Sequence, residues 1–180
     1  MYSIHNVKDI MTVRANWKES EPKKWKLVSV EGIKISKNDY SNYPKELQES
    51  INNFDVIING IVDGTILKTP DDLVDFESQN LTENQTKVLK TLMKDVPRGT
   101  IISYKELGEK AGVGPNAARF VGNTMHLNHW VVIIPCHRVV RTDYSLGNYS
   151  TFGPLVKEKL LKEEGITIKN HFCKPPITTV

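Results

Sequence analysis

Residues 103–128 read SYKELGEKAGVGPNAARFVGNTMHLN, a stretch that predicts two helices joined by a turn. Ser103 can cap the first helix while Glu106, three residues later, returns the hydrogen bond, and the helix should end at Gly112. Pro115 suits the first position of a second helix, which covers NAARFVGNTMHL. Two short helices with a glycine-containing turn between them indicate a helix-turn-helix.

The second predicted helix has side chains suited to nucleic acid. Arg119 is flanked by Ala118 and Gly122, so small residues surround a long cation and would let the backbone approach a groove closely. Asn123 adds polar reach, and no acidic residue that would repel phosphate occurs from 113 to 128. Most helix pairs of this kind bind nothing, so the pattern alone leaves a purely structural role open.

Another helix is predicted upstream of this pair. Thr82 and Gln85 have the spacing of a capping box, and apolar residues then recur at helical spacing until Pro97 stops the helix. Because these strong helical signals begin near residue 82, we expect a C-terminal domain over residues 81–180.

The N-terminal part of the chain has a different texture. WKLVSVEGIKIS (25–36) and FDVIINGIVDGTIL (54–67) are short β-rich runs, and KELQESI (45–51) predicts a helix between them. The acidic stretch 67–80 is typical of a connector that carries a short helix. We therefore expect a small α+β domain with its connector over residues 1–80.

Composition favours an ordinary globular protein. The chain is 39% hydrophobic and 25% charged, without an apolar run long enough to span a bilayer and without the pattern of a secretory signal. We expect a cytoplasmic location, or a nuclear one in a eukaryote. Two cysteines are too few for a disulfide framework, and a net charge of +3 permits a polyanionic partner without demanding one.

One cysteine lies in an informative place. PCHRVVR (135–141) follows the apolar run WVVII (130–134), which is typical of a strand covered on both faces and which Pro135 would end. Cys136 would then lie where the chain leaves the core. The adjacent histidine and the two nearby arginines predict an electropositive setting that lowers the pKa of the thiol.

The residues around this cysteine are also compatible with two roles that are not nucleophilic. Cys136 can be an inert buried thiol, which is common. It can also share a metal site with His126, His129 and His137, although adjacent strand residues point to opposite faces and the histidine spacing fits such a site poorly.

Five motifs together resemble a known family. PCHRVV, SYKELGEKAG, NAARFVGNTMHLN, SLGNYS and VKEKLLKEEG are similar to those of the O6-alkylguanine-DNA alkyltransferases, over about residues 82–165. The resemblance implies an α+β protein with a small N-terminal α/β domain like ribonuclease H. It also implies a mainly α C-terminal domain with a winged helix-turn-helix.

The resemblance implies a repair reaction and its catalytic residues. Cys136 would take the alkyl group from guanine O6, and also from thymine O4, into a stable thioether in one irreversible turnover. His137 would act as base through a water and Glu164 would orient it, although Glu163 fits equally well on spacing alone. Tyr104 would hydrogen-bond the base and help to rotate the nucleotide outward.

The remaining implied roles concern DNA and the base pocket. Arg119 would fill the space left by the flipped base, and Asn128 would brace the turn before the active-site segment. Other DNA contacts would come from Ser103, Ala118 and Asn123. The carbonyls of Cys136 and Val139 would accept from the guanine amine, and the backbone N–H of Ser150 would reach O6. The apolar walls of the pocket would be Met125, Val131 and Tyr149.

Some features depart from the family pattern. Val131 stands where proline is frequent, and the loop that contains Phe152 is about one residue longer than usual.

The resemblance implies a monomer that binds double-stranded DNA with O6-alkylguanine, away from membranes, and that needs neither cofactor nor metal. The alternatives are a sensor of alkylated DNA that does not repair it, and a Cys-His hydrolase.

Overall fold

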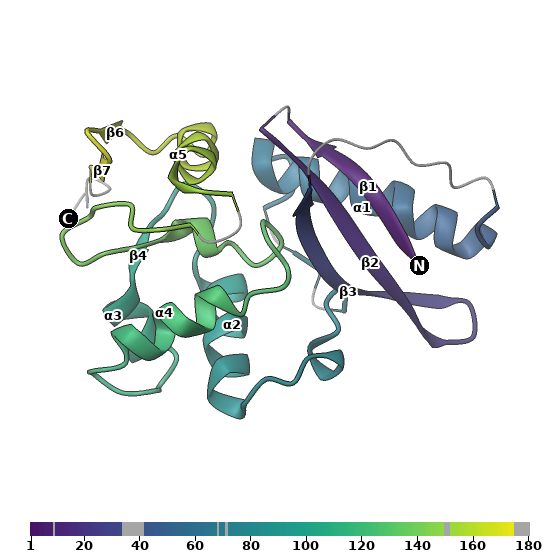
Figure 1. Ribbon diagram of the computed structural model, residues 1–180, viewed down its shortest axis with the longest axis horizontal. Helices are drawn as coiled ribbons and strands as arrows, with labels where there is room; N and C mark the ends of the chain where they lie inside the picture. The colour runs from purple at the N-terminus through teal and green to yellow at the C-terminus, as the bar shows by residue number, and fades with distance from the viewer. Residues whose placement is uncertain (9, 34–41, 68, 71, 150–151, 175–180) are drawn as a thin grey trace. The chain divides into compact units, whose positions relative to one another are not determined.

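The computed structural model describes residues 1–8, 10–33, 42–67, 69–70, 72–149 and 152–174 (Figure 1). The chain forms two compact units. The first contains the described part of residues 1–81 together with 129–133, and the second contains residues 82–128 and the described residues from 134 onward. Helices and small sheets both occur, so the predicted mixed α/β class is confirmed. No described helix is both long and apolar enough to cross a membrane.

The first unit is built on an antiparallel sheet in the order β1-β2-β3. Its strands are β1 (Tyr2–Val7), β2 (Met11–Glu21) and β3 (Lys24–Ile33). Val13, Ala15 and Trp17 are buried while the residues between them are partly exposed, which is the alternation of a strand with one covered face. The helix α1 (Lys45–Asp63) packs against β1 and β3 (Figure 1), and the short 3-10 helix η1 (Phe76–Ser78) lies in the predicted connector.

The predicted strand over 54–67 is wrong. α1 does not end at residue 51 but continues to Asp63, where Gly64 adopts a left-handed conformation with φ 85°. Its buried residues, Leu47, Ile51, Phe54, Ile58 and Ile61, are separated by three or four positions, so they form one face of a helix. The run around Val56 and Ile57 is β-branched and resembles a strand locally, but burial of this face against the sheet decides the outcome.

The second unit contains most of the helices. They are α2 (Glu83–Asp95), α3 (Tyr104–Lys110), α4 (Ala118–His126), the 3-10 helix η2 (Cys136–Arg138) and α5 (Pro154–Glu163). Two short sheets join them, a parallel pair of β4 (Ile102–Ser103) with β5 (Val139–Val140) and an antiparallel pair of β6 (Ile168–Lys169) with β7 (Phe172–Cys173). α2, α3 and α4 contact one another (Figure 1).

The capping predictions for this unit are confirmed. Thr82 accepts a hydrogen bond from the backbone N–H of Gln85 and the Gln85 side chain returns one, and Ser103 and Glu106 do the same at the start of α3. α4 begins later than predicted. Its N-cap is Ala117, so Pro115 precedes the helix instead of occupying its first position.

The segment WVVII is buried as predicted, but it is not a continuous strand. Val132 has a φ of 72°, a left-handed conformation that turns the chain and interrupts any extended ladder. Trp130 belongs to the first unit, where it forms an isolated bridge with Val30 and its indole N–H donates to the carbonyl of Leu27 at 3.1 Å. The apolar composition of the segment therefore reflects burial and not sheet pairing.

Candidate active site

Cys136 opens the one-turn helix η2 and is 8% exposed. Asn128, which follows α4, donates from its side-chain amide to the carbonyl of Ile134 at 2.9 Å and also hydrogen-bonds the Cys136 thiol. The amide of Asn128 therefore connects the end of α4 to the residues that present the sulfur.

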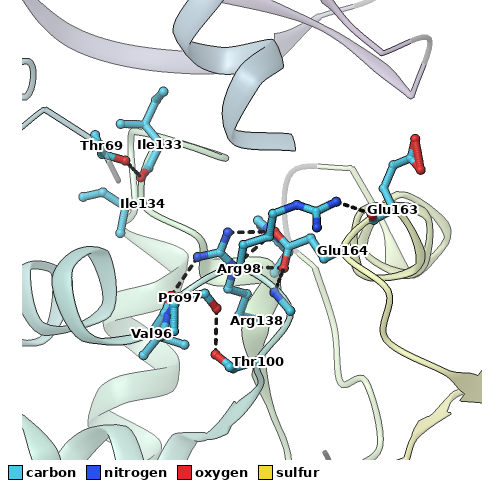
Figure 2. Close-up of polar contacts among 12 residues, drawn as sticks. Thr69, Val96, Pro97, Arg98, Thr100, Ile133, Ile134, Arg138, Glu163 and Glu164 are labelled. Carbon is cyan, nitrogen blue, oxygen red and sulfur yellow. Dashed lines mark hydrogen bonds and ion pairs between the residues drawn. The ribbon is translucent and has the colours of Figure 1, made fainter. Parts of the chain in front are cut away.

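Three charged or polar side chains form a buried cluster, and two of them directly follow Cys136 in sequence. Nε2 of His137 lies 2.9 Å from Oε1 of Glu164. The guanidinium of Arg138 binds the same carboxylate through Nε, at 3.1 and 3.0 Å from its two oxygens, and through Nη2 at 2.7 Å. Nη1 of Arg138 donates to the carbonyl of Val96 at 2.7 Å, so the guanidinium reaches from α5 to the end of α2 (Figure 2).

The cluster fixes the charge state of Glu164. Burial alone would raise the pKa of this carboxyl, but the charge and hydrogen bonds of His137 and Arg138 outweigh burial and hold the pKa at about 2. An ionised carboxylate can only accept hydrogen bonds, so Nε2 of His137 carries the hydrogen.

This arrangement leaves the other ring nitrogen of His137 as a base. Burial lowers the pKa of the imidazole, despite the opposing charge of Glu164, so the ring is neutral at neutral pH. Nδ1 of His137 is buried and makes no hydrogen bond to the described residues. Its lone pair is therefore available to accept a proton.

The structure distinguishes the two glutamates that end α5. Glu164 is buried, whereas Glu163 is exposed and its backbone carbonyl accepts a hydrogen bond from Arg98 (Figure 2). Oε2 of Glu164 also lies 3.4 Å from the backbone N–H of Gly99. Of the two candidates, Glu164 is the one that contacts the histidine.

The expected lowering of the pKa of Cys136 is wrong. Burial raises the pKa of the thiol above its ordinary value, and the hydrogen bond from Asn128 and the charge of Lys157 offset only part of that effect. Arg138, which was expected to favour thiolate, is paired with Glu164 instead. The thiol is therefore protonated at neutral pH and needs a base to react.

Lys157 is a buried residue whose position was not predicted. Its side chain on α5 is 1% exposed, and its ammonium donates to the carbonyl of Val139 at 2.6 Å and to that of Leu146. Burial lowers the pKa of Lys157 to about 8. A signal was present, because Lys157 lies three and four positions before the buried Leu160 and Leu161, on the apolar face of its helix.

The predicted pocket residues belong to different parts of the structure. Tyr149 is buried, and burial together with the nearby Cys136 raises the pKa of its phenol, yet its hydroxyl makes no well-formed hydrogen bond to the described residues. Its ring stacks with Phe152 at a centroid distance of 6.1 Å. Met125 is buried on α4, whereas Val131 belongs to the first unit and Ser150 lies outside the described residues.

The predicted DNA-contacting residues on α4 lie on one exposed side of the helix. Ala118, Arg119 and Asn123 are exposed, while the buried side carries Val121, Thr124 and Met125. Ser103 is different, because it is buried and its hydroxyl accepts the capping hydrogen bond of α3.

The alternative metal site finds no support in the geometry. Among the residues that the structure describes, no three histidine, cysteine or acidic side chains come close enough together to hold a metal ion.

Residues 83–166, which include this cluster, match the family described as "6-O-methylguanine DNA methyltransferase, DNA binding domain". The methylated-DNA--protein-cysteine methyltransferase of Thermococcus kodakarensis is 32% identical over 136 residues, which cover 75% of this chain and 68% of the relative. The chain belongs to the methylated-DNA--protein-cysteine methyltransferase family. The protein of that name from Cricetulus griseus is 47% identical over 88 residues, but the match covers only 42% of the relative.

Solved structures of the methyltransferase family share the fold. Mycobacterium tuberculosis OGT, determined in complex with DNA, superimposes with a TM-score of 0.67 at 23% identity, covering 91% of this chain and 92% of that one. The O6-methylguanine-DNA methyltransferase of Pyrococcus kodakaraensis has a TM-score of 0.59 at 24% identity, with 92% and 98% covered.

Proposed function

We propose that the protein repairs DNA by moving the alkyl group of O6-alkylguanine, and of O4-alkylthymine, to Cys136 in a single irreversible turnover. The observation that carries this proposal is the pairing of Glu164 with Nε2 of His137, which leaves Nδ1 of the same ring as a buried base. His137 directly follows Cys136, whose thiol is protonated. Membership of the methyltransferase family supports the same reaction.

The chemistry follows from the charges of the cluster. Nδ1 of His137 takes the thiol proton of Cys136 through a water, and the carboxylate of Glu164 stabilises the imidazolium that forms. The thiolate attacks the alkyl carbon, the new S–C bond replaces the C–O6 bond, and the departing guanine receives a proton by way of Tyr104. Because a thioether is not hydrolysed, the protein is consumed in the reaction.

Recognition of DNA is assigned to the exposed side of α4. Arg119 fills the space of the flipped nucleotide, and Ala118 and Asn123 contact the strand beside it. Small side chains around Arg119 allow the close approach of the duplex. Ser103 contributes indirectly by holding the start of α3, where Tyr104 begins the helix.

The base pocket is assigned to the segment after η2. The carbonyls of Cys136 and Val139 accept from the guanine amine, and Met125 and Tyr149 form apolar walls. Asn128 supports this pocket through its hydrogen bonds to Ile134 and Cys136.

At the level of domains, we propose a winged helix-turn-helix in the C-terminal domain over 81–180, which binds double-stranded DNA and transfers the alkyl group. The N-terminal domain over 1–80 is assigned a ribonuclease-H-like arrangement of its sheet and helix. The protein acts as a monomer in the cytoplasm, or in the nucleus of a eukaryote.

The test is a count of methyl groups. A duplex carrying O6-methylguanine with a labelled methyl group is supplied in excess, and the label bound to protein is followed with time. We expect a plateau at about one equivalent, and no label on Cys136→Ser although that variant still binds the duplex. Repeated turnover would indicate a hydrolase, and binding without transfer by the unchanged protein would indicate a sensor.

A further inference from the structure

Arg141 is a cation near the candidate active site that the proposed reaction does not use. It follows β5 directly and begins a tight turn, because its backbone N–H donates to the carbonyl of Ser145 at 3.0 Å and its carbonyl accepts from Tyr144 at 2.9 Å. The backbone N–H and the carbonyl of Arg141 are therefore both hydrogen-bonded, which fixes the position from which the side chain extends.

The side chains of Arg141 and Tyr104 both approach Gly147. A Cβ atom at Gly147 would lie 3.7 Å from Nε of Arg141 and 3.7 Å from the hydroxyl oxygen of Tyr104, so both atoms border the same small space. Gly147 has a φ of 66° and no side chain to separate them. Burial and the Cys136 thiolate raise the pKa of the Tyr104 phenol, and the charge of Arg141 opposes both effects.

Arg141 and Asp143 lie close enough for their charges to interact, but Arg141 forms no ion pair within the described part of the chain. No ion pair joins it to any residue described, in contrast to Arg138, which is paired with Glu164. The acidic residue of the same turn, Asp143, instead accepts from the backbone N–H and the hydroxyl of Ser145, at 2.9 and 2.7 Å. The guanidinium of Arg141 therefore remains available to stabilise a negative charge at Tyr104.

We propose that Arg141 is a positioning residue that acts through Tyr104, stabilising the phenol oxygen while Tyr104 donates its proton to the departing guanine. This inference rests on the proposed alkyl transfer. As the S–C bond forms and the C–O6 bond breaks, the electron pair stays with O6 and spreads into the guanine ring. The phenol proton moves to a ring nitrogen, the resulting negative charge on Tyr104 faces Arg141, and solvent returns a proton afterwards.

The test compares rates of a single turnover with free O6-benzylguanine, a substrate without phosphate groups. We expect Arg141→Gln to slow transfer about three- to tenfold, because a single charge acts here through a partly aqueous medium. Arg141→Lys should recover part of the rate. In a Tyr104→Phe background, Arg141→Gln should have no further effect. Lys105→Gln, which removes a charge from the exposed side of α3, is the matched control and should react like the unchanged protein.

An equal loss of rate from Arg141→Gln with and without the Tyr104 hydroxyl would overturn the inference. A loss of rate seen only with DNA would also overturn it, because it would indicate a phosphate contact.

A second measurement does not depend on activity. Ring-labelled tyrosine followed by NMR through alkaline pH should show a higher pKa for Tyr104 in Arg141→Gln, and an unchanged pKa would contradict the inference. If the unchanged protein transfers neither the benzyl group of the free base nor the methyl group of an O6-methylguanine duplex, the proposed function fails, whatever the NMR result.

Discussion

Glu164 and Arg138 form a buried ion pair in which both carboxylate oxygens are bound by one guanidinium. The same carboxylate accepts from His137 at 2.9 Å. Buried ions are costly unless they are paired and fully hydrogen-bonded, and here the pairing also determines which nitrogen of His137 is basic. The cluster therefore links the stability of the second unit to its proposed chemistry.

Replacement of Arg138 by methionine should destabilise the second unit. The substitution leaves the Glu164 carboxylate buried without its main partner, and we expect a loss of about 3–5 kcal/mol in the free energy of unfolding. All three tryptophans, Trp17, Trp25 and Trp130, belong to the first unit, so amide hydrogen exchange in α2 and α5 is the appropriate measurement. A loss below about 1 kcal/mol, the value of an ordinary hydrogen bond, would contradict the buried pair.

The two adjacent glutamates provide a matched pair of variants. Glu164→Gln removes the charge that orients and stabilises protonated His137, and we expect transfer to slow by about tenfold or more. Glu163→Gln removes the same charge from an exposed side chain and should leave the rate unchanged. Single-turnover rates with a methylated duplex measure both. Similar rates for the two variants would show that Glu164 does not support the base.

Acid should destabilise the second unit in a defined range of pH. The pKa of Glu164 is lowered from 4.5 to about 2 on folding, so its contribution is complete above pH 4.5 and is lost as the pH falls toward 2. This linkage is on the order of 3 kcal/mol. Burial also lowers the pKa of His137 from 6.5, so uptake of a proton by the unfolded chain adds a further loss below pH 6.5.

Chemical unfolding across this range tests the linkage. Relative to the unchanged protein, Glu164→Gln should show a shallower dependence of its unfolding free energy on pH below 4.5. Parallel curves for the two proteins would mean that the ion pair does not hold the carboxylate ionised.

Arg119 should matter for DNA and not for the free base. Its side chain is exposed on α4 and does not belong to the buried cluster, so Arg119→Ala should slow repair of duplex DNA by about tenfold or more while leaving the reaction with O6-benzylguanine within about twofold. The ratio of the two rates is the measurement. Equal losses on both substrates would assign Arg119 a structural role.

Local signals were sufficient to predict much of the second unit. The capping boxes at Thr82 and Ser103 depend on residues only three positions apart, and both are present. The apolar runs were less informative, because most of FDVIINGIVDGTIL belongs to a helix and WVVII forms a buried turn. Tertiary contacts decide between these outcomes.

Electrostatics could not be predicted from neighbouring residues in the sequence. The environment of Cys136 depends on whether Arg138 is already paired, and its partner Glu164 lies 26 positions away. Burial of Lys157 likewise depends on carbonyls of two other segments. Composition near a cysteine therefore does not determine its pKa.

The most direct test of the central claim is to locate the transferred group. The protein is incubated with an excess of O6-methylguanine duplex and analysed by intact and tryptic mass spectrometry, which separates Cys136 from the second buried thiol, Cys173. The account predicts a single methyl group, on the peptide that contains Cys136. A methyl group on Cys173, or none on a protein that still binds the duplex, would contradict it.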